Sequence, residues 1–239
     1  MESKTTRPVN FGSSGTPAVS SKEEINPEKG DSAKQILKDD ATPLHQKLED
    51  VYDLINSIKH AMLTTRSGNH MTGRAMSIRE VRPGCDLVFI TNNRSGKMKD
   101  LLEDPHVCCT FFREKTKEWV SISGTARVEN DQSLLMMYWD SSVESWFQNL
   151  GNEYDGGPMD PRMSLIMVTA DSVHYQFQDK STPRVVLEKL KATVSGETPN
   201  VASIRELNSE ELEVGRKMAI QKTIPGTTIS RLRHDKQEE

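Results

Sequence analysis

The sequence predicts a mainly β fold in which six or so antiparallel strands curl into a small barrel flanked by helices. Between residues 60 and 177, apolar residues recur mostly with a period of two, which is typical of strands. Short turns such as Ser67-Gly68-Asn69 and Pro83-Gly84 join neighbouring strands, and this favours antiparallel pairing. Closing such a sheet into a barrel removes its exposed edges.

Composition divides the 239 residues into one domain and two polar tails. Only 34% of the residues are hydrophobic, and they are concentrated in the middle of the chain. We expect residues 1–42 to be disordered, because they bury too little apolar surface to offset the loss of backbone entropy. The barrel domain is expected over residues 43–180, and a helical or disordered extension over 181–239.

Several function classes are disfavoured by charge, hydropathy and cysteine usage. The net charge is -4 and no basic stripe is visible, so we expect no nucleic-acid partner. No apolar run is long enough for a membrane span or a secretory signal. The three cysteines include no CxxC pair, which argues against a disulfide framework or a structural zinc site. A reducing compartment follows, and the cytoplasm is the expected location.

The helices and strands were assigned from periodicity and from residues that favour helix ends. Thr42 is expected to cap the first helix, and the repeat of Leu44, Leu48, Val51 and Ile55 makes that helix amphipathic. The strands are expected at 60–66, 71–81, 86–91, 106–113, 119–129 and 164–177, the last with a possible interruption near Ala170. The helices are expected at 43–59, 95–103, 131–139, 143–150, 185–192 and 209–219.

An anion site is predicted where the strand 86–91 leads into the helix 95–103. Thr91 ends the strand, Ser95 caps the helix, and Lys97 lies in its first turn. A helix N-terminus offers unpaired N–H groups and partial positive charge, which suit a phosphate monoester. Lys97 is unfavourable there for the helix itself, so an anionic partner would account for it. The alternative is that Lys97 and Lys99 form only a solvated helix face.

Three runs of residues in this region resemble a known signature. The run Arg74-Ala75-Met76-Ser77, then Phe89-Ile90-Thr91, then Ser95-Gly96-Lys97 resembles the FMN signature of pyridoxamine 5'-phosphate oxidase-like split barrels. Trp146-Phe147 and Asp160-Pro161 match the general stress protein branch, and fungal blue-light-inducible proteins are also similar. The resemblance covers about residues 43–199 and implies an FMN-binding split β-barrel.

The resemblance also implies roles for individual residues. Arg74 and Lys97 would pair with the flavin phosphate with the help of Ser95, and Thr91 would bond near the ring or the ribityl chain. The segment Ala75, Met76 and Ser77 would run beside the ring. Trp119 stands where related oxidases place a glutamine, so an indole could stack on or edge the ring. Trp146 would close the pocket from the partner subunit, or would be a core or dimer-interface tryptophan.

The implied cofactor is FMN, with FAD also possible, and the implied assembly is a homodimer with flavin at the subunit interface. Three functions stay open. The protein could be a flavin-dependent oxidoreductase acting on a small molecule. It could instead be a non-catalytic flavin-binding stress or sensory protein. The third alternative is a flavin-free dimeric interaction module. No catalytic residue and no metal ligand can be assigned from the sequence.

Overall fold

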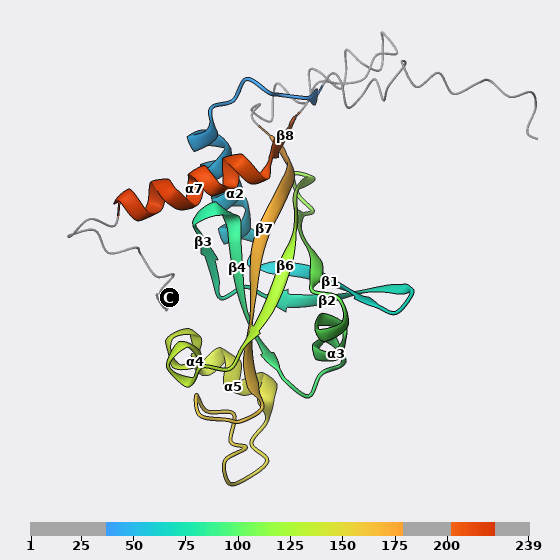
Figure 1. Ribbon diagram of the computed structural model, residues 1–239, viewed down its shortest axis with the longest axis vertical. Helices are drawn as coiled ribbons and strands as arrows, with labels where there is room; N and C mark the ends of the chain where they lie inside the picture. Colours follow the sequence, from blue (N-terminus) through green and yellow to red (C-terminus); the bar gives the residue numbers. More distant parts are fainter. Residues whose placement is uncertain (1–36, 179–201, 223–239) are drawn as a thin grey trace, which may run out of the picture.

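An eight-stranded antiparallel sheet forms the centre of the computed structural model, which describes residues 37–178 and 202–222 (Figure 1). Hydrogen bonds order the strands β2-β1-β5-β6-β7-β4-β3, and β8 pairs with the C-terminal half of β7. The strands are β1 (His60–Ser67), β2 (His70–Ser77), β3 (Glu80–Arg82), β4 (Asp86–Asn92), β5 (His106–Arg113), β6 (Glu118–Glu129), β7 (Met163–Phe177) and β8 (Ser203–Leu207). Within the described ranges β2 and β3 do not pair, so the sheet is a split barrel and confirms the predicted fold class.

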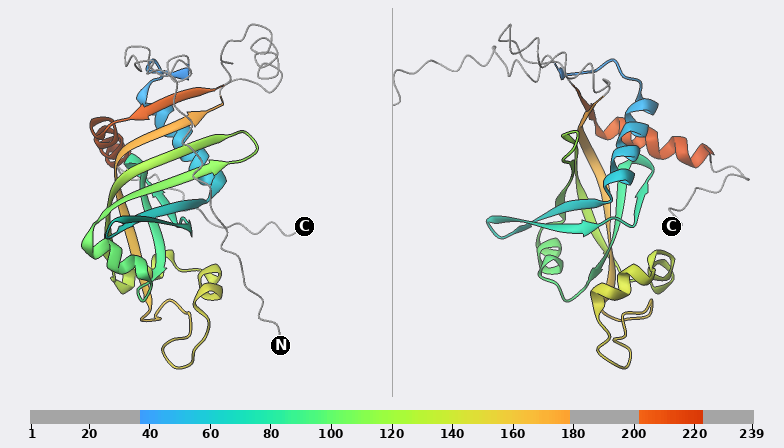
Figure 2. Two further views of the ribbon diagram at one scale, coloured as in Figure 1. Left: turned by 90° about the vertical axis from the view of Figure 1, so that its right-hand side faces the viewer. Right: turned by 180° about the vertical axis from the view of Figure 1, so that it is seen from behind.

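The helices lie at the two ends of this sheet. α2 and α7 lie together near one end, α4 and α5 lie near the other, and α3 lies beside β1 and β2 (Figures 1 and 2). The helical elements are α2 (Leu44–Ile58), the short 3-10 helix η1 (Pro83–Cys85), α3 (Gly96–Glu103), α4 (Gln132–Tyr138), α5 (Ser141–Phe147) and α7 (Ser209–Lys222).

Two apolar cores stabilise the fold, and β4 contributes to both. The larger core fills the curl of the sheet, where α2 buries Val51 and Ile55 against residues such as Phe89 of β4. The smaller core lies on the other face of β4, where Val88 packs with Phe147 of α5. Since successive side chains of a strand point to opposite faces, a strand covered on both sides must be apolar throughout. The strand expected at 86–91 is accordingly apolar on both faces.

Buried charges attach β8 to the rest of the barrel. The Arg205 guanidinium donates from Nε to Asp39 Oδ2 at 2.8 Å and from Nη1 to Asp50 Oδ2 at 2.7 Å. The Tyr175 hydroxyl donates to the same Asp50 oxygen at 3.1 Å. Because Arg205, Asp50 and Tyr175 are all buried, this network joins β8, α2 and β7 through charges that each have a partner.

The largest correction concerns the strand predicted at 71–81. Its two parts, β2 and β3, lie at opposite ends of the strand order. The chain turns between them at Ile78 and Arg79, whose backbone N–H groups donate to the carbonyls of Lys59 and Val88. The alternation of Met76, Ser77, Ile78 and Arg79 continues into this turn, so the sequence indicated one strand where the fold has two.

Smaller differences occur at other element boundaries. Pro43, not Thr42, is the N-cap of α2, because the Thr42 hydroxyl donates instead to Asp39 Oδ2 at 2.7 Å. β7 is continuous, and the expected interruption is a bulge at Asp171, where the β6–β7 register shifts by one residue. β8 was not predicted. The helix expected at 209–219 is present as α7, and the helix expected at 185–192 lies outside the described residues.

Candidate anion-binding site

A tight turn between β4 and α3 creates the candidate site. The Ser95 N–H donates to the carbonyl of Asn92, and the Asn92 side chain accepts from the Arg94 N–H at 2.8 Å. Ser95 has an extended backbone and is the N-cap of α3, as predicted, but its side chain does not cap the helix. The first amides of α3 therefore have no side-chain acceptor at the cap, which is the usual setting for anion binding.

Lys97 is the central residue of this site. Its Nζ donates to Thr91 Oγ1 at 2.9 Å and to Ser95 Oγ at 2.8 Å, so the three predicted residues lie together. Burial, followed by the charge of Arg74, lowers the pKa of the Lys97 ammonium below its ordinary value. Within residues 37–178 and 202–222, no carboxylate lies within 4 Å of this ammonium group. Lys97 is thus a half-buried cation whose protein partners are two neutral hydroxyls.

Arg74 reaches the same region from β2. Its Nη1 donates to Thr65 Oγ1 at 2.7 Å, and its Nη2 donates to Asp100 Oδ2 at 3.2 Å. Thr65 in turn donates to that same Asp100 oxygen at 2.7 Å. The hydrogen bond from Thr65, with further help from Arg74, lowers the pKa of Asp100 and keeps it ionised. Arg74 is therefore held in place by the protein and still has N–H groups left for a ligand.

The charges of this cluster leave it positive. Arg74 and Lys97 contribute two positive charges, and Asp100 contributes one negative charge. The excess is one positive charge in a partly buried site with hydroxyls and helix amides around it. An anion of phosphate type would offset both the unfavourable burial of Lys97 and its repulsion from Arg74.

The other predicted site residues fall into separate groups. Ala75 and Ser77 are exposed, whereas Met76 packs against the larger core. Trp119 is half-buried on β6 and pairs with Phe112 and Gln176 in the ladder. Alternation along the paired strands places Ala75, Ser77 and Trp119 on the outer face of the sheet, away from the side of Arg74.

Trp146 lies on α5 with 83% of its surface exposed, so within this chain it is not packed against the Lys97 cluster. Its neighbour Phe147 belongs to the smaller core. The structure therefore brings together Arg74, Thr91, Ser95 and Lys97, and it leaves both predicted tryptophans apart from them.

Two residues of the cluster were missed from the sequence. Asp100 stands three residues after Lys97, which is a spacing that shares one helix face and could have indicated it. Thr65 lies on β1 and is completely buried, but its position in the sequence does not distinguish it from a threonine that only fills the core. Its role appears only when β1 and β2 pair and bring it close to Arg74.

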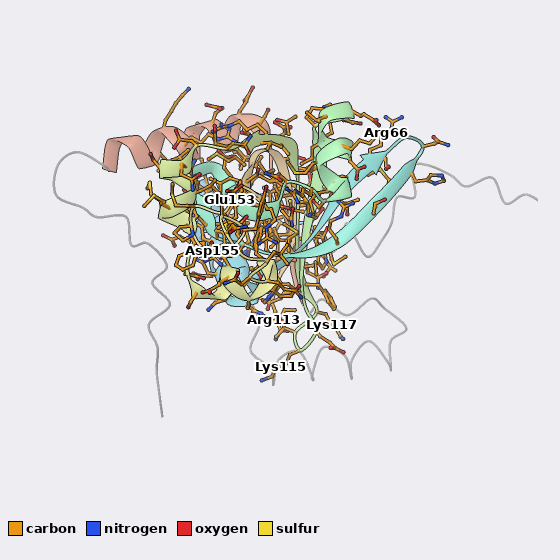
Figure 3. All side chains as sticks on the ribbon, turned by 90° about the horizontal axis from the view of Figure 1, so that it is seen from below. Arg66, Arg113, Lys115, Lys117, Glu153 and Asp155 are labelled. Carbon is orange, nitrogen blue, oxygen red and sulfur yellow. The ribbon has the colours of Figure 1, made fainter. Side chains whose placement is uncertain are left out.

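Other exposed charges lie in different connections. Figure 3 labels Arg113, Lys115 and Lys117 around the tip of the β5–β6 hairpin, at the opposite end of β5 from α3. It also labels Glu153 and Asp155 on the loop after α5. In the described residues, no group of three or more His, Cys, Asp or Glu side chains could hold a metal ion. No described helix is long and apolar enough to span a membrane.

Comparison with known proteins gives one family and a consistent set of relatives. The family model described as "Pyridoxamine 5'-phosphate oxidase like" matches residues 46–200, which is more than half of the chain. The protein bli-3 of Neurospora crassa is 33% identical over 190 residues, which cover 78% of this chain and 91% of that protein.

Solved structures that match this chain are more distant in sequence. A general stress protein 26 from Jannaschia sp. CCS1, itself described as putative, is 21% identical with a TM-score of 0.55. The match covers 69% of this chain and 99% of that one, and it supports the split-barrel fold. A general stress FMN/FAD binding protein from Xanthomonas citri is 20% identical with a TM-score of 0.47, covering 57% of this chain and 92% of that one.

Proposed function

This chain belongs to the pyridoxamine 5'-phosphate oxidase-like family, and on that premise we propose that it is an FMN-binding protein of the general stress type. The observation that carries the proposal is Lys97, a half-buried ammonium group beside Arg74 whose partners among the described residues are two hydroxyls. A site that had lost its ligand would have no physical reason to keep two neighbouring cations. The flavin-free interaction module is therefore the weakest of the three alternatives.

The residues of the cluster fit a phosphate monoester. Lys97, the remaining N–H groups of Arg74, the Ser95 hydroxyl and the first amides of α3 would hold the phosphate. Thr91, which already bonds Lys97, would fix the ammonium group for that contact. FMN is the proposed cofactor, as the resemblance to the FMN-binding split barrels implies, and FAD is the alternative.

The flavin ring would lie beyond this cluster, along the segment Ala75, Met76 and Ser77. β2 lies at the end of the strand order, so its backbone groups would be open to the ring, while Met76 anchors the strand in the core. Bound FMN would supply redox chemistry, by accepting a hydride or electrons at its isoalloxazine ring. The protein would contribute binding and orientation, and we propose an oxidoreductase acting on a small molecule.

A homodimer is part of this proposal. The outer face of the sheet exposes large apolar side chains, among them Met62 and Phe112, at 47% and 54%. A second copy of the chain would cover them and would enclose the flavin between the subunits. Trp119 and the exposed Trp146 would then reach the flavin across the interface. The three cysteines are free, which agrees with the proposed cytoplasmic location.

The first experiment is an FMN titration of the purified protein, followed by absorbance and by gel filtration with light scattering. We expect a flavin spectrum at about 450 nm that survives desalting, about one FMN per chain, and a dimer. Bleaching of the spectrum by NADH or NADPH would support the oxidoreductase. A flavin that no donor reduces would favour the non-catalytic stress or sensory protein, and a protein that releases all added FMN would overturn the proposal.

Substitution of Lys97 tests the site itself. Lys97→Ala is expected to weaken FMN binding by about 2 kcal/mol, because a charge-assisted contact is lost. Adding Arg74→Ala should bring the loss to roughly 3–6 kcal/mol. Lys99→Ala is the matched control, since Lys99 lies on the same helix and its side chain is 81% exposed. Equal FMN affinities for the Lys97 and Lys99 variants would contradict the site assignment.

A further inference from the structure

The turn that carries the anion site is tied to a distant part of the chain through Asn93. The backbone N–H of Asn93 donates to the carbonyl of Arg162 at 2.7 Å. Its side-chain Nδ2 donates to the carbonyl of Pro161 at 2.8 Å. One asparagine thus makes two hydrogen bonds to the segment that leads into β7, 68 residues further along the chain.

That segment is itself firmly held, which makes it a suitable anchor. The Arg162 side chain is 5% exposed and pairs with the fully buried Asp160, with Nη2 and Oδ2 at 2.6 Å. It also donates to the carbonyls of Phe147 at 2.7 Å, Gln148 at 3.0 Å and Tyr154 at 3.3 Å. The guanidinium therefore joins the end of α5, the loop after it and the start of β7.

The buried pair also accounts for two motifs that the anion site does not use. Asp160 and Arg162 flank Pro161, and Arg162 donates from Nη1 to the carbonyl of Phe147 at the C-terminal end of α5. The loop between the Trp146-Phe147 and Asp160-Pro161 motifs exposes Glu153 and Asp155, which Figure 3 labels. The Trp146-Phe147 and Asp160-Pro161 motifs are thus joined by one guanidinium, and the carbonyls of Pro161 and Arg162 present that rigid unit to Asn93.

The position of Asn93 decides what this anchor controls. Asn93 lies two residues before Ser95 and four before Lys97, in the turn that orients the first amides of α3. Asn92 stabilises the turn from within by accepting from Arg94, whereas Asn93 connects the turn to another part of the fold. A turn free to shift would move Ser95 and the helix start relative to Thr91, which stays fixed in β4.

We propose that Asn93 is a positioning residue for the phosphate of the flavin, acting through Ser95 and Lys97 without touching the ligand. This inference rests on the proposed function. The hydrogen bond from the Asn93 side chain to the carbonyl of Pro161 keeps the hydroxyl of Ser95 and the amides of α3 aligned with Lys97. Misalignment of such a cluster weakens contacts to the phosphate and leaves contacts to the ring unchanged.

The test compares FMN with riboflavin, which has the same ring and ribityl chain but no phosphate. Asn93→Ala removes the bond to Pro161 and keeps the main-chain bond to Arg162, so the fold is retained. We expect Asn93→Ala to weaken FMN binding about fivefold, the effect of one lost hydrogen bond, while riboflavin binding changes less than about twofold. Asn149→Ala is the matched control, because Asn149 caps Gly151 within the neighbouring loop and has no bond to the turn.

A double-substitution cycle identifies the route of the effect. In a Lys97→Ala background, Asn93→Ala should change the ratio of FMN to riboflavin affinity by less than about twofold. The ³¹P resonance of bound FMN should shift in Asn93→Ala and should stay in place in Asn149→Ala. Melting temperatures of the ligand-free variants show whether the fold is retained.

The outcomes separate this inference from the proposed function. Failure of the unsubstituted protein to bind FMN would remove the proposed function and this inference with it. If that protein binds FMN but Asn93→Ala lowers FMN and riboflavin affinity equally, Asn93 has only a structural role and the inference is wrong. An unchanged FMN affinity and an unchanged ³¹P resonance in Asn93→Ala would overturn it as well.

Discussion

Gly124 lies where the central strands β6 and β7 approach each other closely, and its substitution tests this close packing. Gly124 lies within β6, opposite Ala170 of β7 and beside the bulge at Asp171. A Cβ atom added at Gly124 would lie 2.1 Å from the carbonyl oxygen of Thr169 and 3.1 Å from Cα of Ala170. Both atoms belong to the backbone, so no side-chain rotation can relieve the contact.

The magnitude follows from this geometry. A carbon and a carbonyl oxygen ordinarily stay about 3.3 Å apart, so the two strands must separate by roughly 1 Å. That displacement would stretch ladder hydrogen bonds in the middle of the larger core. We expect Gly124→Ala to lower the free energy of unfolding by about 3 kcal/mol, at the upper end of overpacking effects.

Urea denaturation followed by fluorescence measures this loss, because the chain contains three tryptophans. Gly96→Ala is the matched control. Gly96 opens α3, and its added Cβ would meet nothing within 4 Å. Alanine favours a helix over glycine, so this variant should gain up to about 1 kcal/mol. A loss below about 1 kcal/mol for Gly124→Ala would refute the close approach of β6 and β7.

Two further predictions concern buried polar groups. Hydrogen bonds from Arg162 lower the pKa of Asp160 from its ordinary value of 3.8 to about 2. The stability that the Asp160 carboxylate contributes is therefore complete above pH 3.8 and is lost as the pH falls towards 2. Asp160→Asn should lower the melting temperature at pH 7, and the melting temperature of this variant should fall less between pH 4 and pH 2. Calorimetry that shows the same fall in both proteins would contradict the ion pair. Tyr175→Phe removes the hydroxyl that donates to Asp50 and should cost about 1.5 kcal/mol in urea denaturation. A neutral result would show that the Asp50 network is satisfied without this hydroxyl.

Local features of the sequence were sufficient for most individual elements. The amphipathic repeat of α2, the hairpin of β5 and β6, and the position of Ser95 at the start of α3 all follow from neighbouring residues. The cluster of Thr91, Ser95 and Lys97 was predictable for the same reason, since it spans seven residues around one strand end. Helix and strand periods and helix caps depend on contacts within a few positions of the chain.

Pairing between distant segments could not be predicted in this way. An alternation of apolar and polar residues does not show where the chain leaves one strand and begins the next. The residues of β2 and β3 were therefore expected to form one strand. β8 is short and polar, and it becomes a strand because β7 offers it an edge and Asp50 offers Arg205 a buried partner. In both cases the deciding contact lies far away in the sequence.

By itself, the sequence determined the mainly β fold class, the family signature and the positive end of α3, because each depends on residue types at short, regular spacing. The resemblance already implied that Arg74 and Lys97 share one phosphate, and the tertiary structure alone decided that Thr65 and Asp100 hold Arg74 in place. It also decided that Asn93 is anchored by the carbonyl of Pro161. These contacts arise only when the sheet folds, since packing and hydrogen bonding then bring together residues whose separation along the chain carries no signal.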